Sequence, residues 1–166
     1  MEHQHDYNSK FTDLVKRHEK IIFSVCFFYA TADIPFDDLR QESLISLFKS
    51  FRNFRGECAE STWVYRVCIN TSLLALRKSI NKIRTVPLDE FPCINFETES
   101  NEDFMHKLQW LYSAISQLNP MDKAIILMWL DELSYDDIAK NMGIPRNTVA
   151  SRLSRIKVKL SSKKEI

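Results

Sequence analysis

The chain contains only two glycines, Gly56 and Gly143, among its 166 residues. Tight β-turns, phosphate-binding loops and doubly wound sheets need glycine where the backbone takes a positive φ angle or approaches a ligand closely. Two isolated glycines cannot complete a GxGxxG, P-loop or GxSxG motif, so the enzyme scaffolds built on those motifs are excluded. The scarcity of glycine therefore favours an all-α fold.

The remaining composition is that of a globular chain with a buried core. Hydrophobic residues make up 45% and charged residues 27% of the chain, and the length suits one ordinary domain or two small ones. The N-terminus has no secretory signal, and the longest apolar stretch, residues 21–32, is too short to cross a bilayer. The four cysteines have no metal-ligand spacing, so we expect reduced thiols in a cytoplasm, no metal and no cofactor.

Charge is strongly segregated along the chain although the net charge is only +1. Residues 49–84 carry eight basic and two acidic side chains, and residues 146–166 carry seven basic and one acidic. Between them, residues 86–105 hold six acidic side chains and no Lys or Arg. Two basic blocks around an acidic strip predict two anion-binding surfaces, whereas solvated helix faces are the plainer interpretation.

Apolar residues at helical spacing predict three helices in the first half of the chain. The first lies within 11–29, the second covers 38–51 and the third covers 61–82, with a loop over the polar stretch between the last two. The second helix carries, opposite its apolar side, a stripe of three polar residues and one apolar residue that suits docking of a protein partner. This stripe consists of Asp38, Gln41, Glu42 and Ile45.

The second half of the chain begins after a predicted flexible, acidic linker over residues 85–103, which contains two prolines. Further helices are predicted over 104–118 and 120–131, the latter started by Asn119 at the N-cap and Pro120 at the first helical position. Ser134 and Asp137 have capping-box spacing and begin a short helix.

The strongest functional signal is a helix, a tight turn at Gly143 and a second helix over residues 134–160. The outward side of the second helix is rich in groups that reach phosphates and base edges. These residues are Arg146, Asn147, Thr148, Ser151, Arg152 and Arg155. The pattern predicts a helix-turn-helix DNA-binding unit, and an αα-hairpin inside a helical bundle is the alternative.

Five segments, taken in order, resemble the extracytoplasmic-function (ECF) sigma factors, group 4 of the sigma-70 family of bacterial transcription initiation factors. They are DLRQE at 38–42, TWVYRVCIN at 62–70, LNP at 118–120, SYDDIA at 134–139 and TVASRL at 148–153. The resemblance covers nearly the whole chain. The sequence departs from the family at several positions, among them Pro145, where a serine cap is usual, and Ala150, where a lysine is common.

The resemblance implies two small helical modules joined by the linker. Residues 1–84 would form a three-helix sigma-2 module, and residues 104–166 a sigma-4 module. Sigma-2 would bind the β′ clamp helices of core RNA polymerase through the 38–45 stripe and open the −10 element. Sigma-4 would bind the β flap and read the −35 element in promoter DNA through the second helix of the helix-turn-helix.

By the same analogy, we expect the −10 element to meet the loop and the third helix of the first module. The loop would cradle an unstacked base, aromatic rings would stack on it, and cations would contact phosphates. The residues expected to take part are Arg55, Gly56, Glu57, Ser61, Trp63, Tyr65, Arg66, Asn70, Arg77, Lys78 and Lys82. For Trp63, a purely structural place in the core is the alternative.

Other functions remain open at this point. A conventional helix-turn-helix regulator would bind a palindromic duplex as a dimer without polymerase. An enzyme is disfavoured, because no paired carboxylates, nucleophile–His constellation or other catalytic residues are present. Family members act in the bacterial cytoplasm and are commonly held inactive by an anti-sigma factor, so the resemblance makes such a factor a further candidate partner. The acidic linker either occupies basic DNA-binding surfaces or is a solvated spacer.

Overall fold

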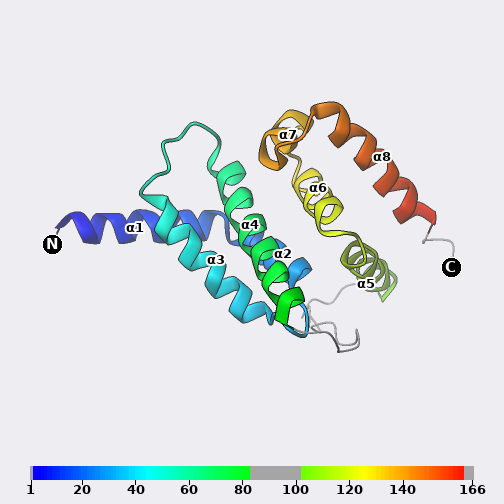
Figure 1. Cartoon of the computed structure of the whole chain (residues 1–166), viewed down its shortest axis with the longest axis horizontal. Coiled ribbons are helices and arrows are strands. Elements are labelled where there is room, and N and C mark those ends of the chain that lie inside the picture. Colours follow the sequence, from blue (N-terminus) through cyan, green and yellow to red (C-terminus); the bar gives the residue numbers. More distant parts are fainter. Residues whose placement is uncertain (1, 83–101, 163–166) are drawn as a thin grey trace. The chain divides into compact units, whose positions relative to one another are not determined.

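The computed structural model describes residues 2–82 and 102–162, and within these ranges the chain forms helices and no β-strand. The chain divides into two compact units, Met1–Arg84 and Thr85–Ile166, and the all-α prediction is confirmed (Figure 1). The helices are α1 (Glu2–Arg17), α2 (Glu19–Tyr29), α3 (Phe36–Phe51), α4 (Glu60–Lys82), α5 (Glu102–Ser116), α6 (Pro120–Leu130), α7 (Tyr135–Met142) and α8 (Arg146–Ser162). The predicted linker lies outside the described residues.

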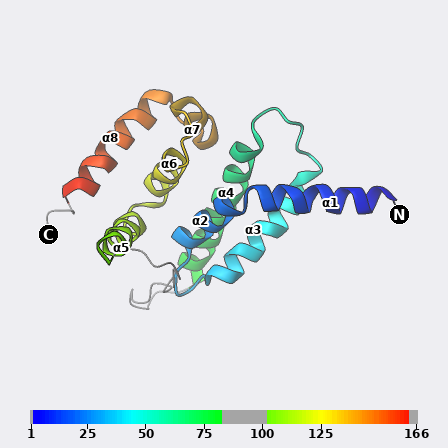
Figure 2. The ribbon, with the colours of Figure 1, turned by 180° about the vertical axis from the view of Figure 1, so that it is seen from behind.

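The first unit has a core made by α2, α3 and α4, which pack against one another in every pairing (Figure 2). Small residues let these helices approach closely: Ser43 of α3 and Ser72 of α4 are both fully buried. Both hydroxyls have hydrogen-bond partners in the core. Ser72 Oγ donates to the Cys68 carbonyl over 2.9 Å, and Cys26 Sγ lies 3.5 Å from Ser43 Oγ. Burial raises the pKa of both the Cys26 and the Cys68 thiol, so these two thiols stay protonated.

The prediction of one helix within 11–29 was wrong, because the chain bends at His18 and forms two helices, α1 and α2. His18 has φ −114° and ψ 18°, yet the backbone hydrogen bonds on either side of it persist. The two halves pack on different partners, since α1 places aromatic rings on the end of α3 whereas α2 packs along α4. One straight helix cannot satisfy both contacts, so the first unit has three core helices and a fourth added at its N-terminus.

The second unit is built around α6, which is buried along much of its length and contacts α5, α7 and α8. The predicted helix starts are confirmed: Asn119 Oδ1 accepts from the Asp122 amide over 2.9 Å, and Ser134 Oγ accepts from the Asp137 amide over 3.1 Å. Gly143 takes the left-handed conformation at the end of α7, with φ 65°. These local signals place α7 and α8 against α6 as a helix-turn-helix unit.

Glu132, between α6 and α7, also has a positive φ, 62°. The amide of Leu133 reaches back to the Met128 carbonyl over 3.1 Å, which closes α6 in the way that glycine usually does. A side chain in this conformation is unfavourable, and glutamate is not a residue that marks such a position in a sequence. Within the described residues, no helix is long and apolar enough to cross a membrane.

Candidate nucleic-acid and protein interfaces

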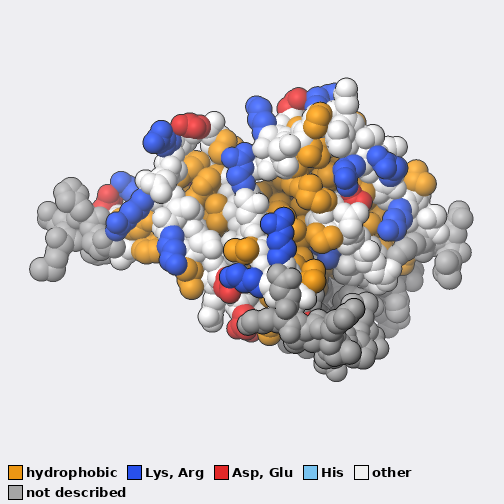
Figure 3. All heavy atoms as spheres, viewed as in Figure 1, with side chains coloured by type: hydrophobic (Ala, Val, Ile, Leu, Met, Phe, Trp, Pro, Cys, Tyr) orange, Lys and Arg blue, Asp and Glu red, His pale blue; other side chains and the backbone are white. Residues whose placement is uncertain are grey.

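The outward side of α8 is formed by the residues that the sequence predicted. Val149, Leu153 and Ile156 are buried against the rest of the unit, which turns the opposite side to solvent. On that side Arg146, Asn147, Ser151 and Arg155 are exposed, and Thr148 and Arg152 are half-buried. Lys and Arg side chains gather over α8 (Figure 3), so the helix presents donors and positive charge together.

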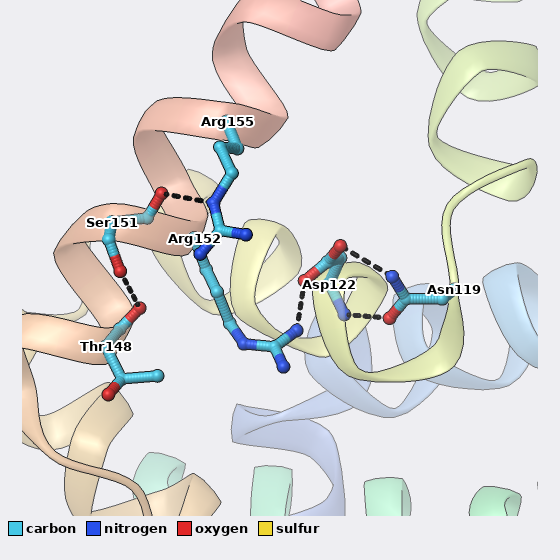
Figure 4. Close-up of polar contacts among 6 residues, drawn as sticks. All are labelled: Asn119, Asp122, Thr148, Ser151, Arg152 and Arg155. Atoms are coloured by element: carbon cyan, nitrogen blue, oxygen red, sulfur yellow. Dashed lines mark hydrogen bonds and ion pairs between the residues drawn. The ribbon is translucent and has the colours of Figure 1, made fainter.

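Several of these side chains are held by contacts within the unit. Ser151 Oγ donates to the Thr148 carbonyl over 3.1 Å, and Arg155 Nε donates to the Ser151 carbonyl over 3.4 Å (Figure 4). Arg146 Nε lies 3.5 Å from Asp136 Oδ1, and its guanidinium lies over the ring of Tyr135 at 5.7 Å from the centroid. The contacts of Arg146 run from α8 to the first turn of α7 and join the two helices of the motif.

Arg152 makes a short ion pair within the second unit. Its Nη1 lies 2.7 Å from Asp122 Oδ1, and Asp122 Oδ2 accepts from Asn119 Nδ2 over 2.6 Å. Asn119, Asp122 and Arg152 therefore form a chain of contacts from the start of α6 to α8 (Figure 4). Local sequence patterns did not reveal this pair, because the partners are thirty residues apart.

Two further cations of this unit are used internally. Lys157 Nζ lies 3.9 Å from the ring centroid of Trp129, on α6. Burial lowers the pKa of the Lys123 ammonium to about 8. Within the C-terminal basic block, Lys157 thus contributes to packing between α6 and α8.

In the first unit, the predicted stripe on α3 is fully on the surface. Asp38, Gln41 and Glu42 are exposed and Ile45 is 52% exposed. Leu39 and Leu47 hold the other side of α3 in the core. An exposed Ile between acidic and amide side chains combines an apolar contact with charge, which suits a protein surface of opposite sign.

The loop between α3 and α4 covers residues 52–59, and Arg55, Gly56 and Glu57 are exposed in it. Gly56 has φ 71°, a conformation that glycine adopts without strain. Trp63, at the start of α4, is half-buried and packs on Phe54 with ring centroids 5.0 Å apart. The tryptophan therefore packs against the loop through Phe54, and Ser61, two residues before it, is half-buried as well.

Tyr65 does not fit the predicted site. Its side chain is fully buried in α4, so its ring belongs to the core and cannot stack on a base. Its spacing from the buried Thr62, Cys68 and Ile69 was the signal that it faces inward. By contrast, the remaining predicted residues of α4 are exposed, namely Arg66, Asn70, Arg77 and Lys78. The side chain of Lys82 lies outside the described part of the structure.

Comparison with known proteins agrees with this two-part arrangement. Residues 14–80 match the model of sigma-70 region 2, and residues 108–160 match the model of sigma-70 region 4. The chain is 31% identical over 161 residues to the ECF RNA polymerase sigma-E factor of Salmonella typhimurium strain LT2, covering 90% of this chain and 83% of the relative. It is 31% identical over 165 residues to the corresponding factor of Haemophilus influenzae, with 92% and 86% covered.

Two solved structures share the fold. One is CnrH in complex with the cytosolic domain of CnrY, with a TM-score of 0.66, 18% identity and coverage of 95% of this chain and 89% of that chain. The other is the sigma factor RpoE in complex with the anti-sigma factor NepR from Bartonella quintana, with a TM-score of 0.69, 17% identity and coverage of 97% and 98%.

These matches define the class of the protein: it is a promoter-recognising sigma factor of RNA polymerase. The chain belongs to the sigma-70 family, in its ECF group. The resemblance found in the sequence motifs is therefore confirmed.

Proposed function

We propose that this sigma factor joins core RNA polymerase through its first unit and reads the two promoter elements with separate surfaces. Residues 1–84 act as region 2, residues 104–166 act as region 4, and residues 85–103 link them. The protein works by binding and not as an enzyme, in the bacterial cytoplasm. The α3 stripe supports the polymerase contact, because its acids and its exposed Ile45 suit the β′ clamp helices.

The −10 element is assigned to the loop 52–59 and the exposed cations of α4. A loop with exposed Arg55 and Gly56 above the half-buried Trp63 offers a place for an unstacked base. Arg66, Arg77 and Lys78 contact phosphates, which add affinity without sequence information. Tyr65 is removed from this assignment because it is buried.

The −35 element is assigned to α8. The exposed polar and basic side chains on the outward side of this helix are the main support for the proposed function. Asn147, Ser151 and Arg155 are exposed there and reach base edges or phosphates. Arg152 has a different role, because Asp122 holds its guanidinium. It steadies α8, and base reading passes to its neighbours. The β flap binds elsewhere on the same unit.

A protein regulator is a further proposed partner. CnrH and RpoE, which share the fold, were solved in complex with the cytosolic domain of CnrY and with the anti-sigma factor NepR. We extend this kind of inhibition to the present chain. Titration of the holoenzyme with candidate inhibitors from the same genome tests it, since an inhibitor releases the core enzyme and a non-partner does not.

The test of the main proposal is reconstitution with purified bacterial core polymerase. The holoenzyme is expected to elute as a stoichiometric complex and to select promoters from a randomised duplex library. Asp38→Lys/Glu42→Lys should weaken this complex, whereas Asp13→Lys/Asp33→Lys, at two exposed acids away from the stripe, should not. Absence of a complex, together with binding of a palindromic duplex by the chain alone, would mean a conventional regulator.

A further inference from the structure

Helix α1 contacts both ends of the loop that we assign to the −10 element. Figures 1 and 2 both show α1 passing across the base of the loop 52–59. Residues 1–13, which include most of this helix, lie before the segment that matches the region 2 model. The contacts that α1 makes through Tyr7 and Phe11 therefore come from residues outside the segment that the family model matches.

At the first end of the loop, α1 supplies two aromatic rings. Tyr7 packs on Phe48 and Phe51 at centroid distances of 5.2 and 5.4 Å, and Phe11 packs on the same two rings at 5.0 and 5.7 Å. Tyr7 Oη donates to the Phe48 carbonyl over 2.6 Å. The guanidinium of Arg52, the first loop residue, lies over the Tyr7 ring at 5.1 Å. The chain leaving α3 is thus held on α1.

At the second end, α1 and the bend after it hold Glu60, the first residue of α4. Arg17 Nη2 donates to both carboxylate oxygens of Glu60, over 3.2 and 2.9 Å, and His18 Nε2 lies 3.2 Å from Oε2. The hydrogen bonds from Arg17 lower the pKa of the Glu60 carboxyl below its ordinary value. Burial opposes them in part, and the contact with His18 makes a smaller contribution to the lowering.

We propose that α1 is a brace that fixes both ends of the loop 52–59 and so holds it in the shape that receives an unstacked base of the −10 element. This inference rests on the proposed −10 function. Arg17, Glu60, Tyr7 and Phe11 are positioning residues in it. Preorganisation matters here because a loop, unlike a helix, has no internal hydrogen-bond ladder to fix its shape.

Cys58 lies inside the loop and provides a direct probe of its freedom. It is half-buried, whereas Cys26 and Cys68 are buried in the core. In a Cys93→Ser background, the rate of reaction with iodoacetamide in the folded protein reports how often the loop opens. We expect Arg17→Glu and Tyr7→Ala/Phe11→Ala to raise this rate about fivefold or more.

Two control variants make the experiment specific. Lys10→Ala breaks an exposed ion pair with Asp6 on the same helix, over 2.8 Å, and should leave the rate unchanged. The swapped pair Arg17→Glu/Glu60→Arg should restore it, which a general loss of stability would not do. Arg17 is 54% exposed, so its variant keeps the fold even if the aromatic variant does not, and thermal melting by circular dichroism checks both.

The same variants are then assembled with core polymerase and tested on a fork probe with a single-stranded −10 non-template strand and on a −35 duplex, both from a selected promoter. We expect weaker fork binding by a similar factor and unchanged duplex binding. An unchanged Cys58 rate overturns the brace. A raised rate with unchanged fork binding overturns its role in DNA binding. Failure of the wild-type holoenzyme to bind the fork probe instead overturns the proposed −10 function itself.

Discussion

The two units hold their proposed DNA-reading elements in opposite ways. In the second unit the element is a helix, α8, whose backbone fixes the spacing of its side chains and which is tied to α6 by the Asp122–Arg152 pair. In the first unit it is a loop, whose shape depends on contacts of its two ends with α1. A helix suits reading of an intact major groove, whereas a loop suits a base that has left the stack.

The largest effect among the tests of this comparison is expected for Tyr65→Ala. Removing a fully buried aromatic side chain from α4 should lower the free energy of unfolding of the first unit by about 3–5 kcal/mol, because it leaves a cavity in the core. Urea unfolding of the full chain should show this loss in the transition of one unit while the other keeps its midpoint. Trp63→Ala, at a half-buried position, serves as the control and should cost less; an equal cost would place Trp63 in the core.

The next largest effect is expected at Arg152, where substitution tells whether this residue stabilises α8 or contacts a base. If the Asp122–Arg152 pair steadies the helix, Arg152→Ala and Asp122→Ala should each weaken −35 binding by about 1–2 kcal/mol, and the double variant by no more than either. The loss should be the same for every base substitution in the −35 element, measured by fluorescence anisotropy. Loss of preference at a single base pair in Arg152→Ala alone would mean that Arg152 leaves Asp122 and contacts a base.

Lys123 should make the stability of the second unit rise with pH in the alkaline range. Its pKa is lowered to about 8 in the folded chain by burial, so between about pH 8 and 10.5 the unfolded state binds more protons and stability rises with pH. Lys123→Met lacks this contribution. The free energy of unfolding of wild type should therefore rise relative to that of Lys123→Met between pH 8 and 10, by on the order of 1 kcal/mol. A constant difference across that range would contradict the burial of the ammonium.

The smallest expected effect is at Glu132, whose φ is 62°. Glu132→Gly should raise the stability of the second unit by about 1 kcal/mol, because glycine adopts this conformation without strain. The neighbouring Asp131, with φ −89°, is a matched control, since glycine at an ordinary φ destabilises. Differential scanning calorimetry should move the two midpoints in opposite directions, and parallel shifts would contradict this explanation.

The parts of the molecule that the sequence predicted well are those determined locally. Asn119, Ser134 and Gly143 each act within a few residues, so the helices around them were predicted close to their observed ends. The bend at His18 depends on contacts with α3 and α4, and the Asp122–Arg152 pair joins distant positions. Hydrophobic spacing alone cannot place either of them.

The same distinction holds for the predicted sites. The exposed residues of α3 and α8 were found by helical periodicity, because a buried side defines its opposite. Tyr65 was misplaced because an aromatic residue suits both a core and a stacking surface, and only packing decides between them. The loop 52–59 was located correctly, but the helix that holds it could not be inferred from its own residues.

The ion pair of Arg152 also has a consequence for how DNA binding responds to electrolyte. Each phosphate neutralised by a protein cation sets free counterions condensed on the double helix, and each such contact steepens the fall of log K with log salt concentration by about 0.9. Arg152 is already neutralised by Asp122 at 2.7 Å, so it sets no counterion free while that pair persists. The affinity of the region 4 unit for its promoter element should therefore fall less steeply with ionic strength than its number of basic residues implies.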